Sequence, residues 1–236
     1  MRIAVISDIH ANLKAIERTL EDLKSKNIDE IYCTGDLVGY APFPNEVIEI
    51  IKSRNIITVQ GNHDEKVGCS INESLSEAKV IELSDGGKAM HWTKNHVTES
   101  NKSWLRSLPK SIEIEKAGKK IMLVHGSPRK NSEYIYEDGE NHLEIMENFH
   151  CDILVCGHTH MPFKKEVEGK LLINAGSVGK PKHGNCNATY VILELSEKAV
   201  EVSIEYVPYE ALDMVEEIVK SEIPDSLGEK LILGIG

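Results

Sequence analysis

Short apolar segments alternate with longer amphipathic segments along the first sixty residues of this 236-residue chain. The apolar segments are rich in β-branched residues, which predicts strands. They span residues 3–6, 30–33 and 56–59. Residues 12–26 and 44–53 place apolar side chains at helical spacing and predict helices, the first with Asn12 as its N-cap. This order of strands and helices predicts a layered α/β domain.

The second half of the chain holds further strand-like segments, several of them joined by short turns. They span residues 112–115, 120–124, 152–155, 163–167, 171–174, 188–195 and 200–207. The turn Glu168-Gly169-Lys170 between two of them is typical of an antiparallel hairpin. So many strands of mixed direction predict two packed sheets with helices outside, an α/β (α+β) fold.

Two more helical regions are expected. Residues 65–110 form an amphipathic excursion from the core, with a break at Asp85-Gly86-Gly87, and could act as a lid over a site. Residues 208–223 predict a last helix. No repeat or low-complexity linker divides the chain, so residues 1–236 are expected to form a single domain.

The charge balance restricts the partners. The chain has 27 basic and 38 acidic side chains and a formal charge of −11, which disfavours a long nucleic acid. No apolar segment approaches membrane-spanning length, and the first one is too short for a signal peptide, so we expect a cytoplasmic protein without a membrane partner. The five cysteines lack C-x-x-C spacing and are expected to be free or buried thiols.

Histidine, aspartate and asparagine residues follow the ends of five predicted strands. They are Asp8, His10, Asp36, Asn62, His63, His125, His158 and His160. Sites in α/β sheets form beyond the carboxyl ends of strands, so these loops are expected to converge. Any one of these residues alone is an ordinary loop residue or helix cap, but the joint pattern favours a metal site. Without His63, these residues supply two carboxylates, one amide and four imidazoles, which suit hard or borderline divalent cations.

The donors can be divided between two cations. One could take Asp8, His10, Asp36 and His160, and the other Asp36, Asn62, His125 and His158, with Asp36 as the bridge. Two cations about 3.5–4 Å apart can lower the pKa of a bridging water enough to produce a hydroxide, which attacks phosphorus in line. His63 follows Asn62 directly and is assigned as the general acid, a role that contributes about 10²- to 10⁴-fold in rate.

Weaker candidates for substrate binding lie downstream. The glycine-rich turn 174–179 could offer backbone N–H groups of Gly176 and Ser177 to an oxyanion. Lys182 follows this turn, and Arg129 and His183 are further substrate-side candidates. The partner expected from this chemistry is a small phosphate ester.

The order of these motifs resembles the calcineurin-like metallophosphoesterase superfamily. The motifs are Asp8-x-His10, Gly35-Asp36, Gly61-Asn62-His63-Asp64, His125 and Gly157-His158-x-His160. The resemblance implies a four-layer α-β-β-α sandwich of two mixed sheets, the ligand division given above, and a catalytic role for Asp36 and His63. The phrases S-D-I-H-A-N at 7–12 and N-A-G-S-V-G-K-P at 174–181 are similar to the small bacterial and archaeal branch, whose members are usually called phosphodiesterases.

The motif at residues 35–40 differs from the corresponding motif of the Ser/Thr protein phosphatases. Ser/Thr protein phosphatases have G-D-x-V-D-R-G where residues 35–40 are G-D-L-V-G-Y, which disfavours protein phosphatase activity and leaves Asp64 as one candidate to orient His63. We expect a metal-dependent phosphoesterase acting on a small phosphodiester or nucleotide. Manganese is the expected metal, with iron, zinc, nickel and cobalt as alternatives. A protein-binding scaffold, a phosphomonoesterase and a nuclease are the alternative functions.

Overall fold

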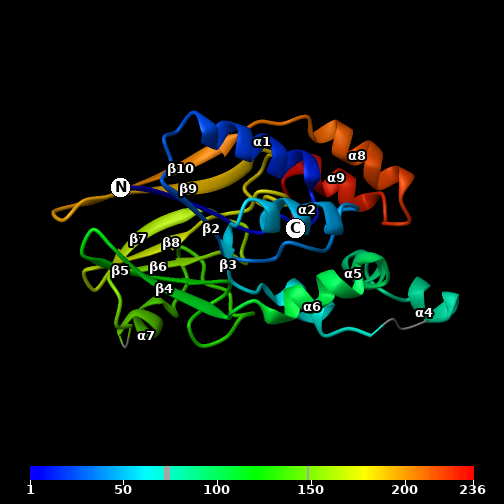
Figure 1. The fold of residues 1–236 in the computed structure, drawn as a ribbon. Coiled ribbons are helices and arrows are strands. Elements are labelled where there is room, and N and C mark those ends of the chain that lie inside the picture. Colours follow the sequence, from blue (N-terminus) through cyan, green and yellow to red (C-terminus); the bar gives the residue numbers. More distant parts are fainter. Residues whose placement is uncertain (72–74, 148) are drawn as a thin grey trace.

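The computed structural model describes residues 1–71, 75–147 and 149–236, which form two mixed five-stranded sheets (Figure 1). The first sheet has the order β10-β9-β1-β2-β3 and the second the order β4-β5-β6-β8-β7. The strands of the first are β1 Arg2–Ile6, β2 Glu30–Cys33, β3 Ile57–Thr58, β9 Ala188–Leu195 and β10 Val200–Val207. Those of the second are β4 Ser111–Lys116, β5 Lys119–Val124, β6 Ile153–Cys156, β7 Phe163–Val167 and β8 Lys170–Asn174. The predicted pair of mixed sheets is confirmed.

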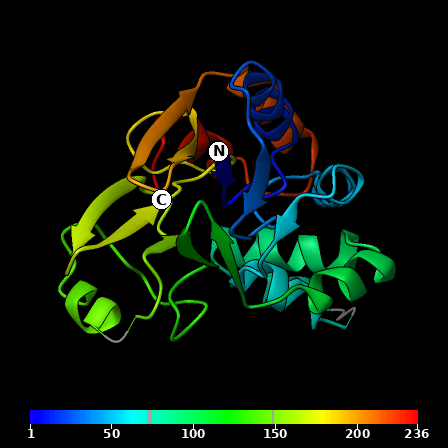
Figure 2. The same ribbon diagram turned by 60° about the vertical axis from the view of Figure 1, so that its left-hand side comes forward.

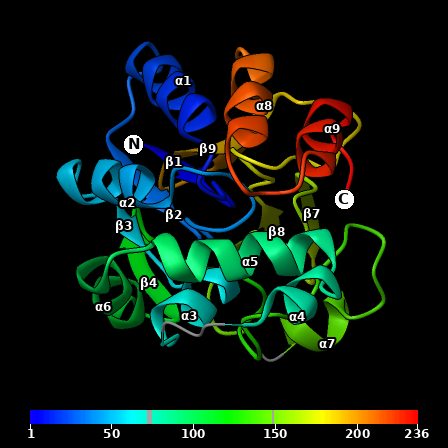
Figure 3. The same ribbon diagram turned by 90° about the vertical axis from the view of Figure 1, so that its right-hand side faces the viewer.

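Nine helices lie within the described residues, outside the two sheets (Figures 1 and 3). They are α1 Leu13–Lys24, α2 Pro44–Ser53, α3 Asn62–Gly68, α4 Glu77–Ile81, α5 Asp85–His96, α6 Glu99–Ser107, α7 His142–Glu147, α8 Ala211–Lys220 and α9 Ser226–Leu233. Asn12 caps α1 as expected, since its Oδ1 accepts the Ala15 N–H at 3.0 Å. None of the described helices is both long and apolar enough to cross a bilayer.

Alternation along the central strands produces the layers. On β1, Ile3 and Val5 pack between the sheets, whereas Ala4 and Ile6 face the helices α1 and α2. The central strands of the second sheet alternate in the same way, with one set of side chains in the inter-sheet core and the other set facing α7. Figure 2 shows the second sheet, green to yellow, beneath the blue and orange strands of the first.

The strand directions bring the loops of interest to one edge. In the first sheet β1, β2 and β3 are parallel, and in the second β5, β6 and β8 are parallel. The antiparallel strands lie outside them, and β7 and β8 form the expected hairpin, with Glu168 and Gly169 at φ values of 52° and 72°. The carboxyl ends of β1, β2, β3, β5 and β6 therefore carry the polar residues singled out in the sequence.

Several boundaries differ from the sequence expectation. β3 has only two residues, and the helical region begins at Asn62 rather than Glu65, because Gly61 serves as the N-cap of α3. The Asp85-Gly86-Gly87 segment is the first turn of α5 rather than a break, since the Ser84 hydroxyl accepts the Gly87 N–H at 3.2 Å. The C-terminal region forms two helices, α8 and α9, where one was expected, and the short helix α7 was not predicted.

Part of the 65–110 excursion is anchored to the rest of the molecule. α5 crosses the face between α8 and α9 on one side and α3 and α4 on the other (Figure 3). Its residue Ala89 is buried with Met214 and Leu231, and Trp92 packs against the same cluster. α4 has no buried residue. Residues 72–74 lie outside the described residues, and closure of this region as a lid stays a prediction.

Candidate metal centre

The seven candidate ligands lie together at the carboxyl edge of the two sheets. In the first group Asp8 Oδ1 lies 3.2 Å from His160 Nε2, and His10 Nε2 lies 3.2 Å from His160 Nε2. Asp36 Oδ2 completes this group at 3.8 Å from His10 Nε2. The loops that follow strands β1, β2 and β6, from both sheets, supply these four side chains.

A second group adjoins the first. His125 Nε2 lies 3.0 Å from Asn62 Oδ1 and 3.2 Å from His158 Nδ1. It also lies 3.3 Å from Asp36 Oδ2, the same oxygen that faces His10. Asp36 therefore belongs to both groups, as a bridging ligand must.

The protonation pattern of the imidazoles suits a cation. His10, His125 and His160 each donate their Nδ1–H to a backbone carbonyl, of Val38, Thr34 and Lys180, at 3.1, 2.9 and 2.5 Å. In the neutral rings each Nε2 then carries a lone pair. Those of His10 and His160 lie 3.2 Å apart, an arrangement that is repulsive until a cation lies between them, and that of His125 lies 3.3 Å from Asp36 Oδ2.

The Asp8 carboxylate completes this picture. Its Oδ2 accepts the Ser7 hydroxyl at 2.5 Å and the His158 N–H at 2.9 Å, whereas the buried Oδ1 has no hydrogen-bond partner. A buried carboxylate oxygen without a proton donor is costly unless a cation binds it. Imidazole, carboxylate and amide donors of this kind fit divalent manganese, iron, zinc, nickel or cobalt.

The pKa values of the titratable groups in the centre are shifted by burial and by their charged neighbours. Burial lowers the pKa of His125, but the Asp36 and Asp8 carboxylates raise it further, to about 9. Burial opposes ionisation of Asp36, but His125 and His63 hold the pKa of Asp36 well below its usual range. Burial lowers the pKa of His63 to about 3. The pocket thus concentrates groups that bind cations, and it disfavours a proton on Asp36 and on His63.

The ligands sit on a backbone that is held in an uncommon conformation. Asp8, His10, Asp36, His158 and His160 have φ between 49° and 65°, in the left-handed region. Such conformations cost about 1–3 kcal/mol each and persist where the surroundings enforce them. Here the short turns after the strands aim all five side chains into one centre.

Asp64 enforces the turn that carries Asp36. Its carboxylate accepts the N–H groups of Asp36 and Leu37, both at 2.8 Å, and of Gly61 at 2.9 Å. Gly61 is required there, since a Cβ would lie 2.1 Å from Asp36 Oδ1. The suggestion that Asp64 orients His63 is therefore wrong: no hydrogen bond joins their side chains among the described residues.

The His63 ring is oriented by packing instead. It lies against His10 and Tyr40, with ring centroids 5.0 Å apart in both cases, and its buried Nδ1 has no hydrogen-bond partner. A Cβ on Gly39 would lie 2.5 Å from that Nδ1. Gly39 stands where the protein phosphatases have aspartate, so the departure in this motif provides the space for the ring. The backbone N–H of His63 donates to Asp36 Oδ1 at 2.7 Å.

The glycine-rich turn supports Asp8 rather than facing substrate. Gly176 N–H donates to Asn174 Oδ1 at 2.9 Å, and Ser177 N–H to Thr189 Oγ1 at 2.8 Å. The Ser177 hydroxyl donates to the Asp8 carbonyl at 2.7 Å. The expectation that Gly176 and Ser177 offer N–H groups to an oxyanion is therefore wrong, because both groups are already bonded.

The other substrate-side candidates are placed differently. Arg129 is exposed and ion-paired with Glu133 and Glu144. His183 bonds Asn185 at 3.1 Å through Nε2. Lys182 is half-buried and its N–H donates to the carbonyl of the ligand His160 at 3.3 Å, so it stays a candidate for substrate binding.

Three residues near the centre escaped the sequence analysis as functional candidates. The buried Lys180 places its ammonium 4.7 Å from the Tyr40 ring centroid. Tyr134 stacks on the ligand His158, with the ring centroids 4.2 Å apart. Tyr134 and Tyr40 lie in irregular segments without hydrophobic periodicity, and only the phosphatase comparison drew attention to position 40.

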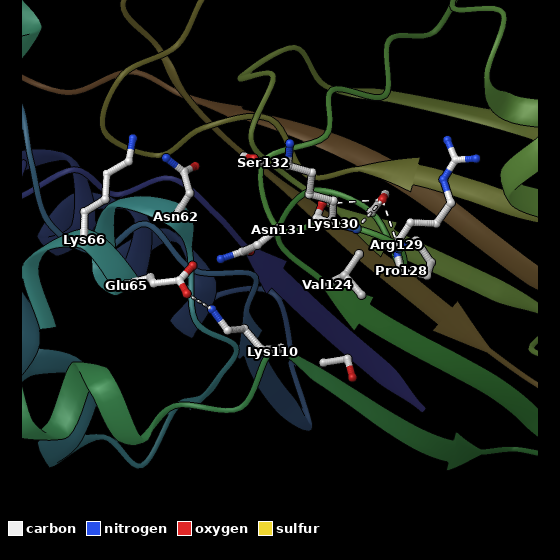
Figure 4. Close-up of a pocket in the computed structure, with 12 residues that line it drawn as sticks. Asn62, Glu65, Lys66, Lys110, Val124, Pro128, Arg129, Lys130, Asn131 and Ser132 are labelled. Atoms are coloured by element: carbon white, nitrogen blue, oxygen red, sulfur yellow. Dashed lines mark hydrogen bonds and ion pairs between the residues drawn. The ribbon is translucent and has the colours of Figure 1, made fainter. Parts of the chain in front are cut away.

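A cavity of about 470 Å³ adjoins the second ligand group, since Asn62 forms part of its wall (Figure 4). Its walls are α3, which begins at Asn62, the start of β4, and the end of β5 with the loop after it. The sequence carried no signal for this cavity, because its walls come from separate segments of the chain.

Two packed mixed sheets with a histidine- and carboxylate-rich centre at their carboxyl edge define a metallophosphoesterase architecture. The chain belongs to the calcineurin-like phosphoesterase superfamily, whose domain model matches residues 1–198. This confirms the resemblance noted in the sequence. Membership implies divalent metals, and the three-residue groups Asp8-His10-His160 and Asp36-His125-His158 are candidate ligand clusters.

Individual relatives agree with this assignment. The chain is 38% identical to an uncharacterised protein of Methanocaldococcus jannaschii over 98% of each chain. It is 26% identical to the phosphodiesterase YfcE of Escherichia coli, covering 82% of this chain and 88% of that protein. A crystal structure of a metallophosphoesterase from Sphaerobacter thermophilus has a TM-score of 0.83 and 31% identity, over 100% of this chain and 99% of that one.

Proposed function

We propose that the protein is a two-metal phosphodiesterase that hydrolyses a small phosphodiester or nucleotide. The observation that carries this proposal is the sharing of Asp36 Oδ2 between two adjoining ligand groups, 3.8 Å from His10 and 3.3 Å from His125. Two divalent cations bound there supply a nucleophile by lowering the pKa of a water and offset the charge that develops on the phosphoryl group.

The protein's own residues position the reacting groups. The His63 N–H fixes Asp36 Oδ1, which leaves Oδ2 to face both ligand groups. The His63 ring lies at the edge of the centre, beside His10 and Asp36, where it can protonate the leaving oxygen.

Substrate size follows from the surroundings. The centre lies in a protein of net charge −11, so cationic ligand sites attract a phosphate while the wider surface repels a long polyanion. Membership of the calcineurin-like phosphoesterase superfamily and similarity to relatives named phosphodiesterases support a diester rather than a protein substrate. The complete ligand set and His63 argue against a pure scaffold, which has no chemical need for a general acid.

The test is hydrolysis of bis(p-nitrophenyl) phosphate and p-nitrophenyl phosphate by metal-stripped protein to which manganese, nickel or zinc is restored. Asp36→Asn is expected to abolish turnover and to weaken binding of both metal equivalents in calorimetry. His63→Gln is expected to lower turnover of a dinucleoside monophosphate, whose alkoxide leaving group needs a proton, by about 10²-fold or more while two equivalents still bind. His91→Gln, at a half-buried position of α5 whose ring contacts Asn95 at 3.3 Å, is the control.

Two outcomes would contradict the proposal. Binding of a single equivalent by the wild type would rule out the shared centre. Binding of two equivalents without turnover of either ester would favour the scaffold alternative.

A further inference from the structure

The cavity beside Asn62 differs in charge from the rest of the molecule. Four cationic side chains line it, with Glu65 as the single acid among its lining residues. The cations are Lys66, Lys110, Arg129 and Lys130. In a protein with an excess of 11 negative charges, this grouping marks a local anion-attracting surface.

Two of the four cations are already neutralised. Lys110 pairs with Glu65 at 2.7 Å, and Arg129 pairs with Glu133 and Glu144. Within the described residues no ion pair involves Lys66 or Lys130, so these two ammonium groups are available to a ligand.

The two available lysines lie on either side of Asn62, the residue that the cavity shares with the second ligand group. In Figure 4 the Lys66 and Lys130 side chains extend to the same edge of the cavity and flank the Asn62 amide. Asn62 Oδ1 in turn lies 3.0 Å from His125 Nε2 in the second ligand group. An anion held between the lysines is therefore next to a phosphate held at the metal centre.

The loop that carries Lys130 is preformed. The Ser127 hydroxyl oxygen accepts the N–H groups of Arg129 and Lys130 at 3.1 and 3.0 Å. On the other wall, Lys66 projects from α3, whose N-terminus carries Asn62. A preformed site loses little conformational entropy when an anion binds.

We propose that this cavity is a subsite for a second phosphate of the substrate. The inference rests on the proposed function for the scissile phosphate and adds the substrate class: a small phosphodiester, such as a nucleotide derivative, that carries a further phosphate away from the reacting phosphorus. Lys66 and Lys130 are its specificity-determining residues.

A matched pair of ligands tests the subsite independently of turnover. Thymidine 3′,5′-bisphosphate and thymidine 5′-phosphate differ by one phosphate, and their affinities for the manganese-loaded protein are measured by calorimetry at one low ionic strength, since salt screens exposed charges. The bisphosphate is expected to bind at least about tenfold more tightly, equivalent to about 1.4 kcal/mol. A ratio near one would overturn the proposal.

Variants assign the preference to particular side chains. Lys66→Gln and Lys130→Gln are each expected to reduce the ratio about threefold, and together to abolish it. Glu65→Gln is expected to raise the ratio, because it removes the one acid and releases Lys110; a merely structural role for this cluster predicts no gain. Lys198→Gln, in the turn between β9 and β10 at the opposite end of the first sheet, is the control.

The p-nitrophenyl esters of the same two nucleotides separate this inference from the proposed function. Turnover of both esters with equal kcat/KM leaves the phosphodiesterase intact and refutes the subsite. A tenfold binding ratio without any turnover supports the subsite and refutes the phosphodiesterase.

Discussion

Replacement of Gly39 by alanine tests whether packing alone orients His63. Gly39 has φ +96°, and a Cβ there would lie 2.5 Å from His63 Nδ1. Carbon and nitrogen atoms cannot approach so closely, and the ring cannot retreat freely because His10 and Tyr40 lie on its other sides. The ring must therefore leave its position beside the centre.

Two effects of different size follow. The left-handed backbone of an alanine costs about 1–2 kcal/mol, which corresponds to a fall in Tm of about 2–8 °C for a chain of this length. Displacement of the general acid removes a contribution of about 10²-fold or more to kcat. Metal binding should persist, because the three atoms nearest to the added Cβ all belong to His63, which is not one of the seven ligands.

The assay compares two diesters and two variants. Bis(p-nitrophenyl) phosphate releases an acidic phenol that needs little protonation, whereas a dinucleoside monophosphate releases an alkoxide that needs a proton. Gly39→Ala is therefore expected to slow the second substrate much more than the first. Gly118→Ala is the matched control, since Gly118 has φ +74° but nothing within 4 Å of the added Cβ, in the β4–β5 turn. It isolates the backbone cost.

Equal losses for both substrates would show that His63 is not the acid. A loss no greater than that of Gly118→Ala would show that the ring tolerates the added methyl group, and the packing argument would then be refuted.

Three further predictions concern the support of the centre. Asp64→Asn should lower the free energy of unfolding by about 3 kcal/mol and metal affinity by about 10- to 100-fold, because it disrupts the three N–H bonds that hold the Asp36 turn; denaturation and metal titration measure both, and unchanged affinity would contradict it. Ser177→Ala should cost about 1–3 kcal/mol in unfolding, since its hydroxyl bonds Asp8 and Lys180, and an effect confined to KM would instead revive a substrate role. Removal of metal by a chelator should lower Tm by about 10 °C, reversed by manganese, because a cation at 1,000 times its Kd stabilises the fold by about 4 kcal/mol; an unchanged Tm would argue against tight binding.

Local pattern determined much of the fold. Strand segments such as 188–195 and 200–207 were predicted to the residue, because β-branched runs bounded by turns have few other stable conformations. The ligand residues were also recognisable, since each follows a strand and their order is specific to one superfamily. Boundaries set by packing could not be recognised in this way. β3 has two residues where four were predicted, and α9 is held by contacts with α5 and α8 that no local pattern records.

Roles that depend on distant neighbours were decided only by the tertiary structure. Gly176 and Ser177 have the composition of an oxyanion-binding turn, yet their N–H groups bond Asn174 and Thr189, which only folding brings near. Asp64 follows His63 in sequence, but the geometry of α3 directs its carboxylate to the Asp36 turn. Sequence thus determined which groups can bind a metal, because that is a property of side-chain chemistry and local strand ends. Folding decided which atoms remain unpaired, because hydrogen-bond partners and charge neighbours come from chain segments far apart.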